Sequence, residues 1–319
     1  MLSALLFLPS FTHTFCMYQH IKKRLFLLLL PLFLSLPACK TEVQQSKPPQ
    51  STHPSQEQST LPGYPKESQS SASSPQPAEK TTENAEHKEK PLFWDVTDVD
   101  ISRVDTKRKL VAFTFDDAPA RTLENILAVF AAFNETHHTH PAYATFFCNG
   151  NRMDNHSSHT LRTAVAMGME LGNHTFSHPN LNTLTQTEIQ AEISRTDELL
   201  QPLDGKKYHL FRAPFGNVNE QVKQAVYTPI MDWTIDTLDW TGRPADEIVQ
   251  TVLSEAYNGA IILMHDGYEN TVEALKTLLP ALDEAGYQTV SVSQLAKAHH
   301  CVLRTGSVYI RARKQGAKA

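Results

Sequence analysis

The chain has 319 residues, with 29 lysines and arginines against 34 aspartates and glutamates, and a formal net charge of −5 at pH 7. This balance argues against nucleic acid as the main partner, because no basic stripe is present to neutralise phosphates. Four cysteines are too few and too scattered for a disulfide framework, and none has a CxxC metal spacing. Cys148 and Cys301 are either ordinary buried thiols or a pair in an oxidising compartment, and the sequence leaves both possibilities open.

An N-terminal targeting segment, residues 1–39, is the first predicted element. A basic KKR patch precedes the apolar residues 25–36, and the tetrapeptide LPAC after them resembles the end of a bacterial lipoprotein signal. The resemblance implies that Cys39 is lipidated and anchors the mature protein to a membrane. An uncleaved membrane helix is the alternative, but the stretch falls short of the roughly 20 residues of a span. Met17 directly precedes the better-formed signal and is a second candidate start.

Residues 40–91 are predicted to form a disordered tether. They are rich in Ser, Gln, Pro, Glu, Lys and Thr, and their few apolar residues cannot offset the entropy of ordering the chain. As a flexible coil, this segment would reach roughly 40 Å. Residues 92–108 are a lead-in that either packs under the following domain or forms a small hairpin, and residues 301–319 are expected to form a C-terminal tail.

From about residue 105 onward, short β-rich runs alternate with helical runs, which indicates a parallel α/β architecture. The candidate strands are 110–115, 143–148, 167–171, 208–212, 229–235, 260–264 and 287–292. The candidate helices include 121–133, 184–200, 218–227, 244–257 and 271–285. Seven such units predict a barrel one unit short of eight, and we assign residues 109–300 to this domain.

The helix predicted at 184–200 has the clearest periodicity. Its apolar face is formed by Ile189, Ile193, Thr196, Leu199 and Leu200. Its glutamates Glu188, Glu192 and Glu198 are expected to point mostly away from that face. We therefore predict a helix that covers the barrel with one side and faces solvent with the other.

Polar side chains follow five of the apolar runs. They are Asp116 and Asp117 after VAFTF, His174 and His178 after MGMEL, Arg212 after YHLF, Asp239 after PIMDW, and His265 after AIILM. Residues just past the carboxyl ends of barrel strands converge on one face, so we expect these side chains to meet in one pocket. One carboxylate and two imidazoles can bind a divalent ion and leave positions open for water and substrate. The sequence therefore predicts a metal site with an acid and a base.

The joint pattern also resembles a known family. VAFTFDDAP, NHTFSH, FRAPFG, DTLDW and ILMHDG, in this order, are similar to the five motifs of the polysaccharide deacetylases, the NodB-homology or carbohydrate esterase group. The resemblance covers roughly residues 109–296. It implies an α/β fold, a distorted (β/α)₇ TIM-like barrel, and removal of acetyl groups from N- or O-acetylated sugars. It also implies a divalent metal, with Zn²⁺ expected and Co²⁺, Ni²⁺ or Fe²⁺ as alternatives.

The resemblance assigns the residues of the expected metal chemistry. Asp117, His174 and His178 match the metal ligands. Asp116 matches the general base, which takes a proton from water, and His265 matches the general acid, which protonates the departing amine. A metal lowers the pKa of bound water towards about 7, so an adjacent carboxylate can act as the base.

The resemblance assigns supporting roles to five further residues. Arg212 matches the residue that holds the base, and Asp239 the one that orients the acid. The backbone N–H of Phe215 is expected to bind the oxyanion. Trp240 and Leu263 match positions that line the pocket for the acetyl methyl group, although both could instead be packed core residues.

Two features depart from the family pattern. Ala118 stands where glycine usually follows the two aspartates, and its methyl group is expected to alter the loop geometry at most; a narrower groove beside the metal is the alternative. The histidines at 137, 138, 140, 156 and 159 belong to none of the motifs. We expect the HHTH run at 137–140 to be a solvated insertion.

Several readings of the function stay open. The favoured substrate is peptidoglycan N-acetylglucosamine or N-acetylmuramic acid, because an anchor and tether would place the domain outside the cytoplasmic membrane near the cell wall; a secreted protein is the alternative. An exopolysaccharide, chitin oligosaccharides and O-acetylated xylan are other candidate substrates. An inactive carbohydrate-binding pseudoenzyme and a non-haem iron oxygenase are more distant alternatives. No obligate protein partner is indicated.

Overall fold

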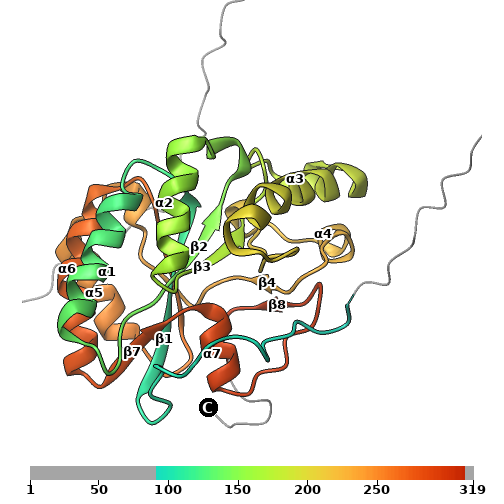
Figure 1. Ribbon diagram of the computed structural model, residues 1–319. Coiled ribbons are helices and arrows are strands. Elements are labelled where there is room, and N and C mark those ends of the chain that lie inside the picture. Colours follow the sequence, from blue (N-terminus) through green and yellow to red (C-terminus); the bar gives the residue numbers. More distant parts are fainter. Residues whose placement is uncertain (1–90, 313–319) are drawn as a thin grey trace, which may run out of the picture. The chain divides into compact units, whose positions relative to one another are not determined.

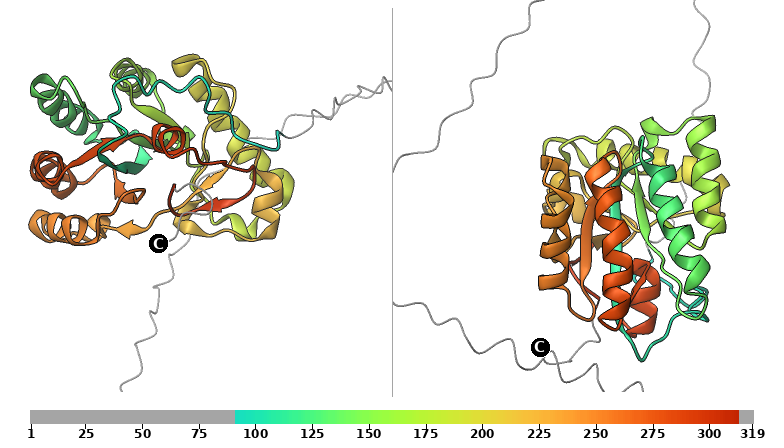
Figure 2. Two further views of the ribbon diagram at one scale, coloured as in Figure 1. Left: turned by 90° about the horizontal axis from the view of Figure 1, so that it is seen from below. Right: turned by 90° about the vertical axis from the view of Figure 1, so that its left-hand side faces the viewer.

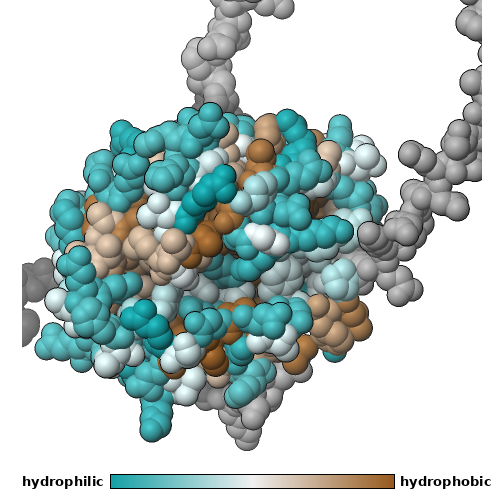
Figure 3. Space-filling model, in the orientation of Figure 1, coloured by the Kyte–Doolittle hydropathy of each residue, from teal (hydrophilic) through white to brown (hydrophobic). Residues whose placement is uncertain are grey.

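The computed structural model describes residues 91–312 (Figure 1). The predicted signal, with Met17 and Cys39, and the predicted tether up to residue 90 lie outside the described residues. Within 91–312, no helix is both long and apolar enough to cross a membrane. Hydrophilic residues cover most of the face shown in Figure 3, and hydrophobic residues form separate patches between them.

A parallel sheet forms the centre of the domain. Its longest strand is β1 (Lys109–Ala118), and the sheet order is β3-β2-β1-β6-β5, with β7 also paired to β1. A two-stranded sheet contains β4 and β8. The remaining strands are β2 (Thr145–Cys148), β3 (Glu170–Asn173), β4 (Ile230–Met231), β5 (Ile235–Asp236), β6 (Ile261–His265), β7 (Tyr287–Val290) and β8 (Val308–Tyr309). Because all the named strand pairs are parallel, their carboxyl ends lie on one side.

Helices lie around most of the outside of these strands, as the left-hand view of Figure 2 shows. They are α1 (Leu123–Thr136), α2 (Asn155–Ala166), α3 (Gln186–Asp204), α4 (Glu220–Ala225), α5 (Ala245–Glu255), α6 (Glu269–Glu284) and α7 (Val292–Ala298). Local sequence explains the limits of α3, which begins with a capping box between Thr185 and Glu188 and ends at Gly205 with φ 79°. The predicted α/β class is confirmed.

The strand predicted at 208–212 does not form as a full strand. Phe211 alone makes parallel bridges, one to Asn173 and one to Ile230, and so links the two sheets. The strand predicted at 229–235 is divided into β4 and β5. This region is irregular because its backbone groups bond to side chains as well as to neighbouring strands: the carbonyls of Met231 and Asp232 accept hydrogen bonds from the Arg212 guanidinium.

Two helices were not predicted. The buried residues of α2 are only Thr160, Leu161 and Ala164, so its sequence lacks a strong apolar stripe. Its start is nevertheless specified locally, by a capping box in which the Asp154 carboxylate accepts from the Ser157 N–H at 2.8 Å. The second, α7, is a short helix in a region predicted as strand and domain end.

The core lies on both sides of β1. On one side, Phe115 stacks on Phe146 with ring centroids 5.0 Å apart. On the other, Leu110 packs with Val290 and Leu295 of the segments β7 and α7. Burial of these side chains, each contributing about 1.5–3 kcal/mol on transfer from water, holds the strand ends in place.

The lead-in 92–108 and the segment 301–312 both pack onto the domain. Trp94 and Val104 join the cluster around Leu110, and the Trp94 N–H donates to the Leu303 carbonyl at 2.8 Å. The lead-in therefore packs under the barrel. Residues 301–312, which we expected to belong to a tail, contribute the buried side chain of Leu303 and the strand β8.

Candidate active site

A pocket of about 410 Å³ lies at the carboxyl ends of the strands. It is lined by Asp116, Asp117, His174, His178, Phe215, Trp233, Asp236, Trp240, Leu263, His265 and Tyr268. Arg212 and Asp239, the other two residues singled out from the sequence, are fully buried and bond to the pocket residues Asp116 and His265. The residues predicted from five separate motifs are thus brought together.

The register of the sheet explains why the predicted base and acid are neighbours. Asp116 at the end of β1 lies opposite His265 at the end of β6. The parallel pairing continues one residue further, where the Asp266 N–H donates to the Asp116 carbonyl at 2.9 Å. Strand pairing therefore places a carboxylate and an imidazole side by side at the rim of the pocket.

Asp117, His174 and His178 form a cluster suited to a metal ion. One ligand atom from each lies within 4.8 Å of the others. Asp117 Oδ1 is buried without a hydrogen-bond partner among the described residues and lies 3.7 Å from His178 Nε2. A buried carboxylate oxygen that accepts no hydrogen bond and faces imidazole nitrogens fits a divalent cation, and a set of two nitrogens and one oxygen is a common zinc set.

The surroundings of His174 and His178 suit both imidazoles to binding a metal ion. His174 Nδ1 donates to the Arg212 carbonyl at 2.8 Å, which selects the tautomer with a free Nε2. The pKa of His178 is lowered, first by burial and then by the positive charge of His174 when that residue is protonated. A lower pKa keeps the imidazole neutral, as metal binding requires.

Asp116 is held by the buried Arg212. The guanidinium donates from Nη1 to Asp116 Oδ1 at 2.8 Å and to Thr114 Oγ1 at 2.7 Å. Burial by itself raises the pKa of Asp116, but the charge of Arg212, with those of His174 and His265, outweighs burial and lowers it. The carboxylate is therefore ionised near neutral pH and can accept a proton.

His265 is held by the buried Asp239. Its Nδ1 donates to Asp239 Oδ1 at 2.8 Å, and its backbone N–H donates to Asp239 Oδ2 at 2.7 Å. Burial by itself lowers the pKa of His265. The Asp239 hydrogen bond and the negative charges of Asp116 and Asp239 raise the pKa by more than burial lowers it, so that the net shift is upward. The imidazole is thus biased towards its protonated form, with Nε2 left for a second partner.

Phe215 and Trp240 flank the pocket as exposed aromatic residues, with 65% and 52% of their surfaces accessible. Phe215 has a positive φ of 60°, and its ring meets that of His178 edge to face at 4.7 Å. Leu263 is only 3% exposed yet lines the pocket. Exposed aromatic faces beside a polar centre suit an amphipathic ligand such as a sugar.

Several residues near the site were not singled out from the sequence. Trp233, Asp236 and Tyr268 line the pocket. Arg152 approaches Asp117, donating to its carbonyl at 2.8 Å and lying 3.5 Å from its Oδ1. Asp236 is inside the DTLDW motif, but Arg152 comes from the turn after β2, where no sequence pattern indicated proximity.

Two expectations about neighbouring residues need correction. The Ala118 side chain is buried in the core, and the residue pairs with Cys148, so its methyl group does not narrow the pocket. The 137–140 run is not simply solvated. His137 and His140 lie 3.6 and 2.9 Å from the carboxylate of Asp283, because the end of α1 packs beside the end of α6.

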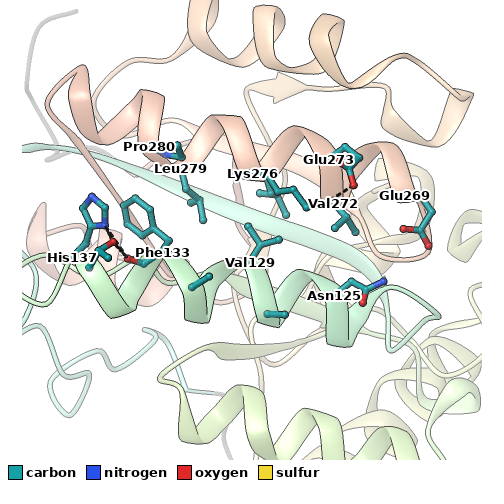
Figure 4. Close-up of a pocket in the computed structure, with 14 residues that line it drawn as sticks. Asn125, Val129, Phe133, His137, Glu269, Val272, Glu273, Lys276, Leu279 and Pro280 are labelled. Atoms are coloured by element: carbon teal, nitrogen blue, oxygen red, sulfur yellow. Dashed lines mark hydrogen bonds and ion pairs between the residues drawn. The ribbon is translucent and has the colours of Figure 1, made fainter.

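A larger hollow of about 740 Å³ lies between α1 and α6. Figure 4 shows Val129 and Phe133 on one side and Val272 and Leu279 on the other. Its walls are mostly apolar but include charged residues, and it contains none of the candidate metal ligands Asp117, His174 and His178. The larger cavity is therefore not the candidate active site, because the candidate metal ligands, base and acid all line the smaller pocket.

Comparison with known proteins agrees with this geometry. The family described as polysaccharide deacetylase matches residues 103–228. A peptidoglycan-N-acetylglucosamine deacetylase of Bacillus cereus is 32% identical over 214 residues, which cover 62% of this chain and 92% of that protein. The peptidoglycan-N-acetylmuramic acid deacetylase PdaC of Bacillus subtilis is 32% identical over 192 residues. The matched region covers 60% of this chain but only 40% of that longer protein.

A solved structure supports the same assignment. The structure described as T48 deacetylase with substrate has 34% sequence identity and a TM-score of 0.59, and covers 65% of this chain and 99% of its own. This likeness confirms the predicted NodB-type distorted barrel. The match over 92% of the Bacillus cereus deacetylase and the shared fold lead to one conclusion, that the chain belongs to the polysaccharide deacetylase family.

Proposed function

We propose that this protein is a metal-dependent polysaccharide deacetylase that hydrolyses N-acetyl groups of cell-wall glycans, most of all peptidoglycan amino sugars. One arrangement carries the proposal. A carboxylate held by a buried arginine and an imidazole held by a buried aspartate face the same pocket as the three-residue ligand cluster. An inactive sugar-binding relative would have no need of both buried partners.

The metal ligands would be Asp117, His174 and His178, and zinc is the expected ion. A divalent cation bound there supplies a Lewis acid that acidifies water and polarises the acetyl carbonyl. Asp116 is not one of the proposed ligands and is assigned the role of general base. Its Oδ1 accepts a hydrogen bond from Arg212, and its Oδ2 lies 3.6 Å from His174 Nε2, on the side of the ligand cluster.

Hydrolysis needs a proton taken from water and a proton given to the amine. Asp116 accepts the first as the water oxygen bonds to the acetyl carbon. His265 donates the second from Nε2 as the carbon–nitrogen bond breaks, leaving acetate and a free amino sugar. The two residues lie side by side at the ends of the paired strands β1 and β6, so both can reach a substrate bound in the one pocket that they line.

Phe215, Trp240 and Leu263 are assigned to binding the acetyl group of the substrate and the oxyanion that forms from it. The backbone N–H of Phe215 would donate to the oxyanion that develops on the acetyl oxygen. Trp240 and Leu263 would contact the acetyl methyl group, and the exposed face of Trp240 is also available to a sugar ring. These contacts would favour a short acyl group over a longer one.

The choice of peptidoglycan is supported by the names of relatives and, separately, by a prediction from the sequence. Relatives that span most of this domain have names that describe action on peptidoglycan. The predicted lipid anchor at Cys39 and the tether after it would hold the domain outside the cytoplasmic membrane, within reach of the wall. A secreted form would act on the same polymer.

An acetyl ester is the second candidate substrate. The base, acid and oxyanion donor of the pocket act on the acyl group, and the same groups can cleave a carbon–oxygen bond. O-acetylated xylan would then be the polymer. Chitin oligosaccharides would be taken by the amidase activity without any change of mechanism.

Acetate release by residues 91–319 tests the proposal. Peptidoglycan, chitin oligomers and acetylated xylan would each be supplied to chelated protein and to protein with added zinc. We expect zinc-dependent release that is greatest with peptidoglycan and is lost in Asp116→Asn. If zinc binds but no polymer loses acetate, the protein is a glycan-binding relative and the proposed function is wrong.

A further inference from the structure

The two histidine ligands of the proposed site belong to one tightly bent segment, residues 173–178, which we call the ligand loop. Thr175 and His178 both have positive φ angles, 68° and 58°, in a backbone region that residues with side chains rarely adopt. Such conformations persist only where surrounding contacts fix them. The contacts that fix the ligand loop therefore also set where the ligand atoms lie.

One end of the loop is bound to α3 through Asp197. The Asp197 carboxylate accepts from Asn173 Nδ2 at 2.8 Å, and Asn173 Oδ1 accepts from the Thr175 N–H at 2.9 Å. Thr175 Oγ1 in turn accepts from the His178 N–H at 3.1 Å. A chain of three hydrogen bonds, the first two of them buried, thus runs from the helix to the backbone of a proposed ligand.

Asp197 is itself fixed from behind. His209 is buried, and its Nδ1 donates to Asp197 Oδ1 at 2.8 Å, while its Nε2 lies 3.2 Å from Asp204 Oδ1. A buried carboxylate with this support cannot change rotamer without breaking bonds to both sides. The rigid end of the network is therefore in α3 and the segment after it, and the strained end is in the ligand loop.

The other end of the loop is bound to α3 through Glu192 and Arg195. Glu192 accepts from the Ser177 N–H at 2.7 Å and from Ser177 Oγ at 2.8 Å. The Arg195 guanidinium lies over the Phe176 ring, 3.5 Å from its centroid. Both contacts fall on residues that directly precede His178.

We propose that Glu192, Arg195 and Asp197 are positioning residues that hold the ligand loop in its strained, metal-binding conformation. This inference rests on the proposed function, since it assigns α3 a role in the metal site proposed there. None of the three contacts the ligand atoms. Their removal is expected to let the loop relax and to weaken metal binding, beyond any effect on the stability of the helix.

The test is the zinc affinity of the chelated protein, residues 91–319, measured by competition with a chromophoric chelator. Outer contacts of metal ligands commonly contribute about 10- to 100-fold to affinity. We expect Glu192→Ala and Asp197→Asn each to weaken zinc binding at least about tenfold. Glu192→Gln, which can still accept from Ser177, should recover part of the loss, and Glu198→Ala, on the same helix, is the matched control.

The visible absorption of Co²⁺ added in place of zinc provides a second readout, because it reports the geometry of the ligands. A changed spectrum in Glu192→Ala, with thermal stability close to that of the wild type, would support positioning. Unchanged affinity and spectrum in both variants, even with a lower melting temperature, would show that α3 only supports the fold. Acetate release by the wild type judges the proposed function separately; if the wild type binds no zinc, both proposals fail.

Discussion

Replacing Asp239 with asparagine should remove most of the activity while leaving the metal ligands in place. The buried carboxylate accepts from His265 Nδ1 at 2.8 Å, from the His265 N–H at 2.7 Å and from Thr271 Oγ1 at 2.6 Å. An asparagine must turn its NH₂ group towards at least one of these donors. The variant therefore loses at least one charge-assisted bond and all of the negative charge.

The expected loss follows from these contacts. Hydrogen bonds to a charged group contribute about 1.5–3 kcal/mol each, so losing one or both of those to His265 costs about 1.5–6 kcal/mol. Since about 1.4 kcal/mol changes a rate tenfold, kcat/KM should fall by roughly 10- to 10⁴-fold. The upper part of this range agrees with what a positioned general acid usually supplies.

The pH profile gives a sharper check than the rate. His265 must be protonated to act as the acid, so activity is lost as pH rises through its pKa. Because Asp239 contributes to raising that pKa, the alkaline limb of kcat/KM should move to lower pH in Asp239→Asn.

The assay is acetate release from a chitin oligomer across the pH range in which histidine titrates. Thr271→Val is the control, since it removes one donor to Asp239 and keeps both bonds to His265. If the alkaline limb stays in place in Asp239→Asn, His265 is not the acid or Asp239 does not tune it. A similar shift in Thr271→Val would also refute the reasoning.

Three further predictions concern stability. Zinc at about 100 times its Kd should stabilise the chelated protein by about 2.7 kcal/mol in thermal denaturation, and Asp117→Ala should abolish this gain. The hydrogen bonds from His209 to Asp197 and Asp204 outweigh the effect of burial and raise the pKa of His209 in the folded state. The stabilising contribution of His209 is therefore complete below about pH 6.5 and is lost as pH rises through the folded pKa. Urea unfolding should show that the wild type is more stable than His209→Gln at low pH and that this advantage disappears as pH rises. Arg212→Met should lower the unfolding free energy by roughly 3 to 5 kcal/mol, because Asp116 stays buried without its partner, and a urea midpoint near that of the wild type would contradict this.

The larger order of the fold could be read from the chain. Apolar runs such as 111–115 and 260–264 are short and lie between helical patterns, which is typical of parallel strands. The run at 208–212 has the same character but forms only the bridges of Phe211. Local pattern does not report whether a neighbouring strand is close enough to pair, so this difference could not be predicted.

The placement of helix α3 shows a second limit. Ile189, Ile193 and Leu200 are buried as their spacing indicated, but Leu199 is 39% exposed and Asp197 is buried. A charged residue is expected to face solvent unless it pairs with a buried partner. Here the partners, Asn173 and His209, are distant in the sequence, and no helical periodicity can reveal them.

By itself, the sequence determined which side chains could form the site, because polar residues after successive parallel strands must meet at one end of the sheet. Asp116 and His265 follow this rule directly. Only the tertiary structure decided how these residues are held, with Arg212 and Asp239 fully buried behind the pocket and α3 bonded to the ligand loop. The physical reason is that pattern along a chain reports which face is apolar, whereas burial and hydrogen bonding between distant residues depend on how the elements pack.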